Sequence, residues 1–348
     1  MILPRLAPGA AVAIIRLRSM GDTVLTTPAL ALLKQARPDL RIFVVVEQPW
    51  KRLLERNPDI DGLITVAAGG RGRAISEVRH LRPELCLNLH GGSTSSWITA
   101  LSRARWRAGF AHFQASAIYN VKIPRAQEIL GRAPDEPVHT AEHLASAVFY
   151  LGAPQGEIPR ARLYVDPPQR AGPYAVLHIA AAYFTKEWPA ERFAEIARWL
   201  RQECGLEPVL LTGPGQGHLL GGMKEFDTYE NPPLGEMMSL VSGARLFLGN
   251  DSGPAHVAAA FGVPCVVIFG SSNSRVWRPW RTRHEVVETA WDCKPCPGDR
   301  CYAFDRPHCI LSVEVAAVER AVRSLLPLPT FGVFSATSGP TGCGSQCR

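Results

Sequence analysis

The sequence lacks any apolar run long enough to cross a bilayer. A membrane-spanning helix needs about 20 consecutive apolar residues, and no apolar run in this 348-residue chain approaches that length. The N-terminal stretch MILPRLAPGAA is interrupted by prolines and is too short for a secretory signal peptide. Both absences argue against a membrane-spanning or secreted protein, so we expect a cytoplasmic one.

The chain also lacks a block of basic charge. Its 38 lysines and arginines exceed its 31 acidic residues and give a net charge of +7, but they are spread along the whole sequence. This spread argues against a nucleic-acid-binding tail, and we expect no nucleic-acid partner. A moderately basic surface still favours an anionic partner, such as a phosphorylated small molecule or an anionic membrane surface, with RNA as the less favoured choice.

Neither disorder nor a fibrous class is indicated by the composition. Hydrophobic residues make up 46% of the chain and charged residues 20%, which is typical of a globular protein with substantial cores. The chain is too long for one ordinary core and fits two domains.

The first half alternates apolar runs with amphipathic stretches. Buried strands are predicted at 11–17, 41–47, 62–67 and 84–90, and helices at 27–36, 50–56, 73–81, 95–104 and 139–152. Strand and helix alternating at this spacing predict an α/β architecture with a parallel, doubly wound sheet.

The second half repeats this alternation. Strands are predicted at 174–180, 207–213, 244–250 and 264–270, with helices near 190–203, 234–243, 253–261 and 313–326. Residues 153–173 contain five prolines and fit a connection between domains. We therefore predict an N-terminal domain at 1–160, a C-terminal domain at 161–326 and a disordered tail at 327–348, with a cleft between the carboxyl ends of the two sheets.

LRSMGDTVLTTPAL, residues 17–30, follows the first predicted strand and so faces this cleft. Gly21 permits a tight turn or the close approach of a ligand, and Pro28 fits the first turn of a helix. Asp22 has two interpretations, a helix cap or a general base held over the cleft. The residues alone do not separate the two.

Two further segments follow strands of the second half. In GNDSGPAH, residues 249–256, a strand ends and a helix of small residues begins, and such a helix start suits a phosphate or pyrophosphate. Asp251 and His256 have structural interpretations too, as a cap and as a packed side chain. Lys186 lies in the loop after the first strand of this half, where it could neutralise a phosphate or simply be solvated.

Together the three segments resemble glycosyltransferase family 9, the heptosyltransferases of lipopolysaccharide core synthesis. The family patterns are Gly-Asp-x5-Pro-Ala-Leu, Lys-x-Trp-Pro-x3-Phe and Asn-Asp-Ser-Gly-Pro-x-His, found here from Gly21 to Leu30, Lys186 to Phe193 and Asn250 to His256. Their order and spacing agree over roughly residues 11–325.

The resemblance implies a GT-B fold, in which two Rossmann-like domains face a central cleft. It places the acceptor on the N-terminal domain and a nucleotide sugar, typically ADP-heptose, on the C-terminal one. It implies an inverting transfer without a required cofactor, with Asp22 as catalytic base and a donor site formed by Lys186, Asp251, Ser252, Gly253 and His256.

The resemblance also implies an anionic glycolipid acceptor and peripheral contact with the cytoplasmic face of the inner membrane. The segment 88–110 is basic and rich in hydroxyl groups, which suits such a headgroup, although simple solvation explains Arg103, Arg105 and Arg107 equally well. Where family members often place a glutamate against the nucleoside, this chain has Gln216, which leaves the nucleotide preference open.

Four cysteines lie close together in the sequence just before the last predicted helix. Cys293, Cys296, Cys301 and Cys309 have the spacing C-x2-C-x4-C-x7-C, which can form a structural zinc site. A partly disulfide-linked segment is the alternative, and neither interpretation is catalytic.

Two other functions remain open at this point. One is a nucleotide-sugar epimerase of the same two-domain architecture, which would need no lipid acceptor. The other is a non-catalytic nucleotide-sugar-binding protein, in which Asp22 is only a cap.

Overall fold

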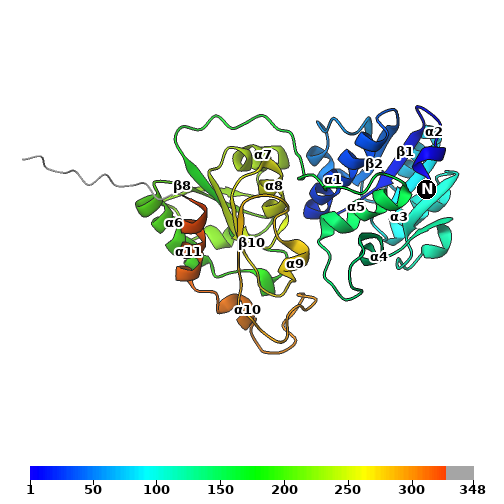
Figure 1. Cartoon of the computed structure of the whole chain (residues 1–348). Coiled ribbons are helices and arrows are strands. Elements are labelled where there is room, and N and C mark those ends of the chain that lie inside the picture. The colour runs from blue at the N-terminus through cyan, green and yellow to red at the C-terminus, as the bar shows by residue number, and fades with distance from the viewer. Residues whose placement is uncertain (327–348) are drawn as a thin grey trace, which may run out of the picture.

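The structure, a computed structural model, describes residues 1–326, so the disorder predicted for 327–348 lies outside the described residues. Two sheets of parallel strands lie side by side in Figure 1, the first from the blue and cyan half of the chain and the second from the green to orange half. Within residues 1–326 no helix has the length and apolar character needed to span a bilayer. The expected α/β fold of two doubly wound domains is confirmed.

The first sheet has the strand order β3-β2-β1-β4-β5-β6. Its strands are β1 (Ala11–Ile15), β2 (Arg41–Glu47), β3 (Gly62–Val66), β4 (Leu85–Asn88), β5 (Trp106–Phe110) and β6 (Val121–Ile123). Its helices are α1 (Met20–Ala36), α2 (Arg71–Leu81), α3 (Ser93–Leu101), α4 (Ala126–Leu130) and α5 (Thr140–Leu151), with short 3-10 turns η1 (Leu3–Arg5), η2 (Gln48–Leu53) and η3 (Ser116–Ile118).

The second sheet has the order β12-β11-β10-β7-β8-β9, which is the same topology. Its strands are β7 (Tyr174–His178), β8 (Glu207–Thr212), β9 (Asp227–Glu230), β10 (Leu246–Asn250), β11 (Cys265–Ile268) and β12 (His284–Val287). Its helices are α6 (Ala190–Cys204), α7 (Leu234–Ser242), α8 (Gly253–Phe261), α9 (Ser274–Trp277), α10 (His308–Leu311) and α11 (Val315–Leu325), with η4 (Phe184–Lys186) and η5 (Gly217–Leu220). The exact domain boundary at 160 and 161 stays a prediction.

Helix α1 begins earlier than the sequence suggested. It starts at Met20, so Pro28 lies inside the helix and the prediction that it occupies the first turn is wrong. A proline there removes the N–H that would bond to the carbonyl four residues back. The hydroxyl of Thr27 donates to that carbonyl of Val24 instead, at 2.9 Å, which helps the helix to tolerate the proline.

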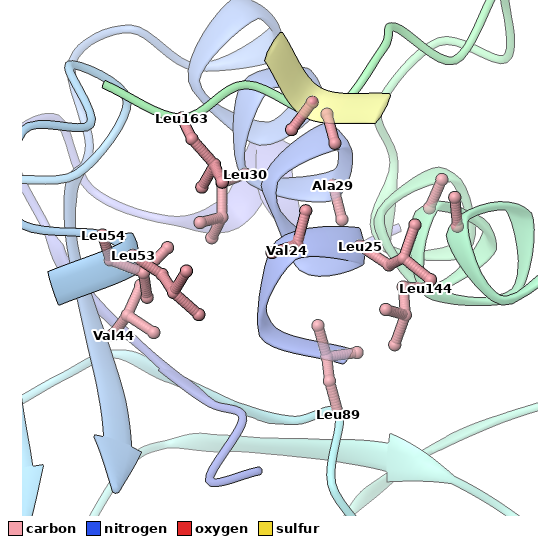
Figure 2. Packing of buried hydrophobic residues seen from close by; sticks show 14 of the residues in the cluster. Val24, Leu25, Ala29, Leu30, Val44, Leu53, Leu54, Leu89, Leu144 and Leu163 are labelled. Carbon is pink, nitrogen blue, oxygen red and sulfur yellow. The ribbon is translucent and has the colours of Figure 1, made fainter. Parts of the chain in front are cut away.

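The buried face of α1 anchors it in the core of the first half. Figure 2 shows its side chains Val24, Leu25, Ala29 and Leu30 among Val44, Leu53, Leu54, Leu89, Leu144 and Leu163. The same buried cluster continues into the second half through Val257 and Ala258 of α8, against which α1 packs. Helix α1 therefore joins the cores of both halves, and its first turn lies where they meet.

Candidate active site between the two sheets

Asp22 lies in the first turn of α1, at the carboxyl end of β1. Its Oδ2 accepts hydrogen bonds from the backbone N–H and the hydroxyl of Ser19, both at 3.0 Å. Ser19 is the N-cap residue, and the two side chains form a reciprocal capping box. The interpretation of Asp22 as part of a helix cap is thus confirmed, and its role as a base stays a prediction.

Arg16 holds the other oxygen of this carboxylate. Its guanidinium pairs with Oδ1 of Asp22 and also donates to the carbonyl of Leu89, and its side chain is only 13% exposed. Burial lowers the pKa of Arg16 from its ordinary value, and the charge of Asp22 opposes that shift. Sequence reasoning missed Arg16, although a cation directly after the buried strand β1 was a visible signal.

His90 follows β4 and is the third polar group at this edge. The side-chain oxygen of Asn88 accepts from the backbone N–H groups of His90 and Gly91, at 2.9 and 3.0 Å, and so fixes the turn. Burial, together with the charges of Arg16 and Arg18, lowers the pKa of His90 to about 4, although Asp22 opposes the shift. A neutral imidazole therefore accompanies Asp22 at pH 7.

On the second half, Lys186 and Asp251 come together from loops 65 residues apart. The Nζ of Lys186 lies 2.9 Å from Oδ2 of Asp251, which also accepts from the hydroxyl of Ser272. Asp251 is not the cap of α8, because Ser252 occupies the N-cap position, so that structural interpretation of Asp251 is wrong. The carboxylate instead orients the lysine at the carboxyl edge of the sheet.

The start of α8 lies beside this pair and is braced from β7. The hydroxyl of Ser252 lies 3.2 Å from Nδ1 of His178, the last residue of β7. Burial lowers the pKa of His178 to about 4, so the ring is neutral at pH 7. Sequence reasoning did not single out His178, although a polar residue ending a buried strand was a usable signal.

The first turns of α1 and α8 touch, and two glycines make this contact close. A β-carbon added at Gly21 would lie 2.5 Å from Cδ2 of His256, and one added at Gly253 would lie 2.8 Å from the Met20 side chain. Both distances are well below van der Waals separation. In each helix the glycine backbone therefore packs directly against a side chain of the other helix.

His256 lies between the two groups of charges. Its Nδ1 is buried and has no hydrogen-bond partner among residues 1–326. Burial lowers the pKa of His256, opposed by the charges of Asp251 and Asp22 and supported by that of Lys186. An unpartnered buried nitrogen is costly unless a ligand satisfies it.

A cavity of about 480 Å³ opens beside this contact and is lined from both halves. Met20 and Trp50 come from the first half, and His178, Thr212 and Met237 are among those from the second. The hydroxyl of Thr212 is buried without a partner in the described part of the chain. A mostly apolar cavity with a few polar groups suits a planar, partly polar ligand such as a nucleobase.

Gln216 does not line this cavity. Its side-chain amide donates to the carbonyl of Ala181 at 2.9 Å, which ties its loop to the segment before Lys186. A contact between Gln216 and a nucleoside therefore stays a prediction.

A second cavity, of about 780 Å³, lies over the first half. It is lined by Glu47 at the end of β2, by residues that follow β2 and β3, including Gln48 and Ala67, and by Arg71 and Thr94 at the starts of α2 and α3. Its position at the carboxyl ends of the strands is where open α/β sheets bind ligands.

The four clustered cysteines do not form the predicted zinc site. Within residues 1–326, no three His, Cys, Asp or Glu side chains lie close enough together to hold a metal ion. Cys293 is exposed and Cys309 is buried, whereas the thiol of Cys301 lies 3.6 Å from the carbonyl of Arg306.

This segment supports the candidate donor loops instead. The N–H of Cys296 donates to the carbonyl of Ser271 at 3.0 Å, and the carbonyl of Gly298 accepts from the hydroxyl of Thr185. Thr185 directly precedes Lys186, so the cysteine segment helps to position the lysine.

Comparisons with known proteins identify a matching family, related sequences and related structures. Residues 71–303 match the model of glycosyltransferase family 9 (heptosyltransferase). Lipopolysaccharide heptosyltransferase 3 of Escherichia coli is 27% identical over 349 residues, covering 91% of this chain and 99% of that protein.

Solved structures show the same fold. A family 9 glycosyltransferase from Veillonella parvula aligns with a TM-score of 0.75 at 23% identity, covering 91% of this chain and 97% of the other. E. coli heptosyltransferase WaaC with ADP aligns with a TM-score of 0.71 at 19% identity, covering 91% and 100%.

Proposed function

Because the chain belongs to glycosyltransferase family 9, we propose that this glycosyltransferase moves a heptose, or a related sugar, from ADP-heptose to the inner core of lipopolysaccharide or a related glycolipid. One observation carries the proposal. The carboxylate of Asp22 and the Lys186–Asp251 pair are both close enough to act on His256, which lies at the contact between α1 and α8 and whose buried Nδ1 has no partner within residues 1–326.

The donor diphosphate is assigned to the carboxyl edge of the second sheet. Lys186 supplies a full positive charge, and the start of α8 at Ser252 and Gly253 adds the positive end of a helix dipole. The nucleoside takes the cavity next to His178 and Thr212. The hydroxyl of Thr212, buried without a partner within residues 1–326, supplies a polar contact. E. coli WaaC, which shares the fold, was solved with ADP.

The chemistry follows from these placements. Asp22 removes the proton from an acceptor hydroxyl, and the hydroxyl oxygen attacks the anomeric carbon of the sugar. The bond from that carbon to the diphosphate oxygen breaks, so the configuration is inverted. Lys186 and the start of α8 stabilise the charge that develops on the leaving diphosphate, and this step needs no metal ion.

The acceptor is assigned to the cavity over the first sheet. Arg71 gives this cavity a positive charge beside the carboxylate of Glu47, and Arg18 lies near the neutral His90 at the edge towards Asp22. This arrangement suits an anionic sugar carried on a lipid. We propose that the enzyme works at the cytoplasmic face of the inner membrane, in peripheral contact with it.

Thermal stabilisation by a panel of nucleotide sugars tests the donor assignment. We expect ADP-sugars to raise the melting temperature of the purified protein and other nucleotide sugars to raise it less. Indifference to ADP-sugars would overturn the heptosyl assignment and leave the fold untouched.

Replacing Asp22 by Asn tests the chemistry. The amide preserves the shape of the cap but cannot accept a proton, so turnover should fall by about 10²-fold or more, while stabilisation by the donor persists. Surviving turnover would show that Asp22 is not the base. Product formed without any acceptor would favour the epimerase alternative.

A further inference from the structure

Helix α3 exposes two large apolar side chains on one side. Trp97 is 53% exposed and Leu101 is 41% exposed, and their spacing of four residues places them one turn apart on the same face. The side chains of Ser95, Ile98 and Thr99, on the opposite face, are buried against the domain. Trp97 and Leu101 thus expose a large apolar area on the outer side of α3.

Three arginines lie on or next to this part of the chain. The guanidinium of Arg71 lies 5.9 Å from the centre of the Trp97 ring. Arg103 and Arg105 are exposed just after the end of α3, and the guanidinium of Arg105 lies 5.2 Å from the centre of the Trp106 ring. Within residues 1–326, none of the three forms an ion pair with a carboxylate. Their positive charge is therefore available to an outside partner.

The same surface borders the cavity assigned to the acceptor. Arg71 lines that cavity and also contacts the Trp97 ring. Thr94, which also lines it, precedes Trp97 by one turn of α3. Helices α2 and α3 pack together, so the position of the exposed surface relative to the cavity mouth is fixed.

We propose that this surface, formed by Arg71, Trp97, Leu101, Arg103 and Arg105, docks on an anionic phospholipid bilayer. Tryptophan favours the interface between lipid and water, and each arginine near an anionic surface strengthens attachment. Docking holds the cavity mouth over the membrane, where a lipid-anchored acceptor presents its headgroup. The inference deepens the proposed function and rests on it for the identity of the acceptor.

Co-sedimentation with vesicles tests the docking surface. The full-length protein should bind vesicles of phosphatidylcholine that contain phosphatidylglycerol, and bind pure phosphatidylcholine weakly. R103Q/R105Q should lower the partition coefficient by about 30-fold, because each arginine near the surface contributes roughly a fivefold change. W97S/L101S should lower it by about 10-fold or more, through loss of buried apolar area.

Matched controls come from exposed residues elsewhere. Tyr150 on α5 is 40% exposed and Arg320 on α11 is exposed, so Y150S and R320Q should bind vesicles like the wild type. Melting temperatures check that every variant is folded. On a delipidated oligosaccharide acceptor, W97S/L101S should keep wild-type turnover, whereas on acceptor embedded in vesicles it should lose most of it.

The outcomes separate this inference from the proposed function. A wild-type protein that ignores anionic vesicles overturns the docking surface, whatever its activity, and so does equal binding by R103Q/R105Q and wild type. Dimers that form through Trp97 and Leu101 without lipid would assign the surface to a second copy of the chain and also overturn the inference. Vesicle binding through these residues without any response to ADP-sugars would overturn the donor assignment alone.

Discussion

Replacing Gly21 by Ala isolates the contact between the two halves of the enzyme. The added β-carbon would lie 2.5 Å from Cδ2 of His256, whereas carbon atoms pack at about 3.5 to 4.0 Å. The first turns of α1 and α8 must therefore move apart by about 1 Å, or the buried His256 ring must move. We expect G21A to separate Asp22 from the donor site.

The expected magnitudes follow from this displacement. Overpacking costs roughly 1 to 3 kcal/mol of stability, and a misplacement of about 1 Å costs about 10²-fold in turnover. Locally the substitution should help, because Gly21 lies in a helix where alanine is favoured by about 0.5 to 1 kcal/mol. A loss of stability can therefore be assigned to the contact with His256.

Thermal denaturation and steady-state kinetics measure both effects. In a double-mutant cycle, adding H256A removes the ring that the new methyl group meets, so the melting temperature should recover while donor affinity does not. Unchanged melting temperature and turnover in G21A would refute the reasoning, because they would mean that these helices are apart in the working enzyme.

Three further predictions concern the donor side and pH. K186M should weaken ADP-sugar binding by about 10-fold or more, because it removes the positive charge and leaves Asp251 unpaired, as calorimetry would detect. The melting temperature should fall as the pH drops from about 6.5 to about 4. In the folded protein, burial holds the pKa values of His139, His143 and His178 near 4. In this pH range the histidines of the unfolded chain bind protons and the buried ones do not, so acid favours the unfolded state. A flat profile would contradict their burial. G298A should lower donor affinity several-fold, because the φ of Gly298 is +88° and a β-carbon there would lie 2.8 Å from the Ser271 hydroxyl. An unaltered affinity would show that the cysteine segment does not support the donor site.

The strands that the sequence revealed are those buried on both faces. β1, β4, β7 and β10 are buried throughout, and their mainly apolar runs were recognisable without any partner. β6, β9 and β12 were missed because they are short edge strands with exposed or half-buried residues, which leave no continuous apolar run. The interior strand β5 was missed as well, because Arg107 and Gly109 interrupt its apolar run.

The sequence predicted those residues of the candidate site that lie in the loops directly after predicted strands. Asp22, Lys186 and Asp251 were found because carboxyl ends of parallel strands face the cleft. Arg16 and His178 were missed because their partners, Asp22 and Ser252, are fixed only by the fold. The zinc prediction failed because it was based on sequence spacing, which does not fix where the cysteine side chains point.

The first turn of α1 combines three requirements within four residues. Ser19 caps the helix together with Asp22, Gly21 makes room for the side chain of His256 from α8, and Asp22 itself is the proposed base. The cap and Arg16 fix the position of the carboxylate at the contact of the two halves. The structural role of Asp22 therefore supports its proposed catalytic one, because a base is effective only when its geometry is set in advance.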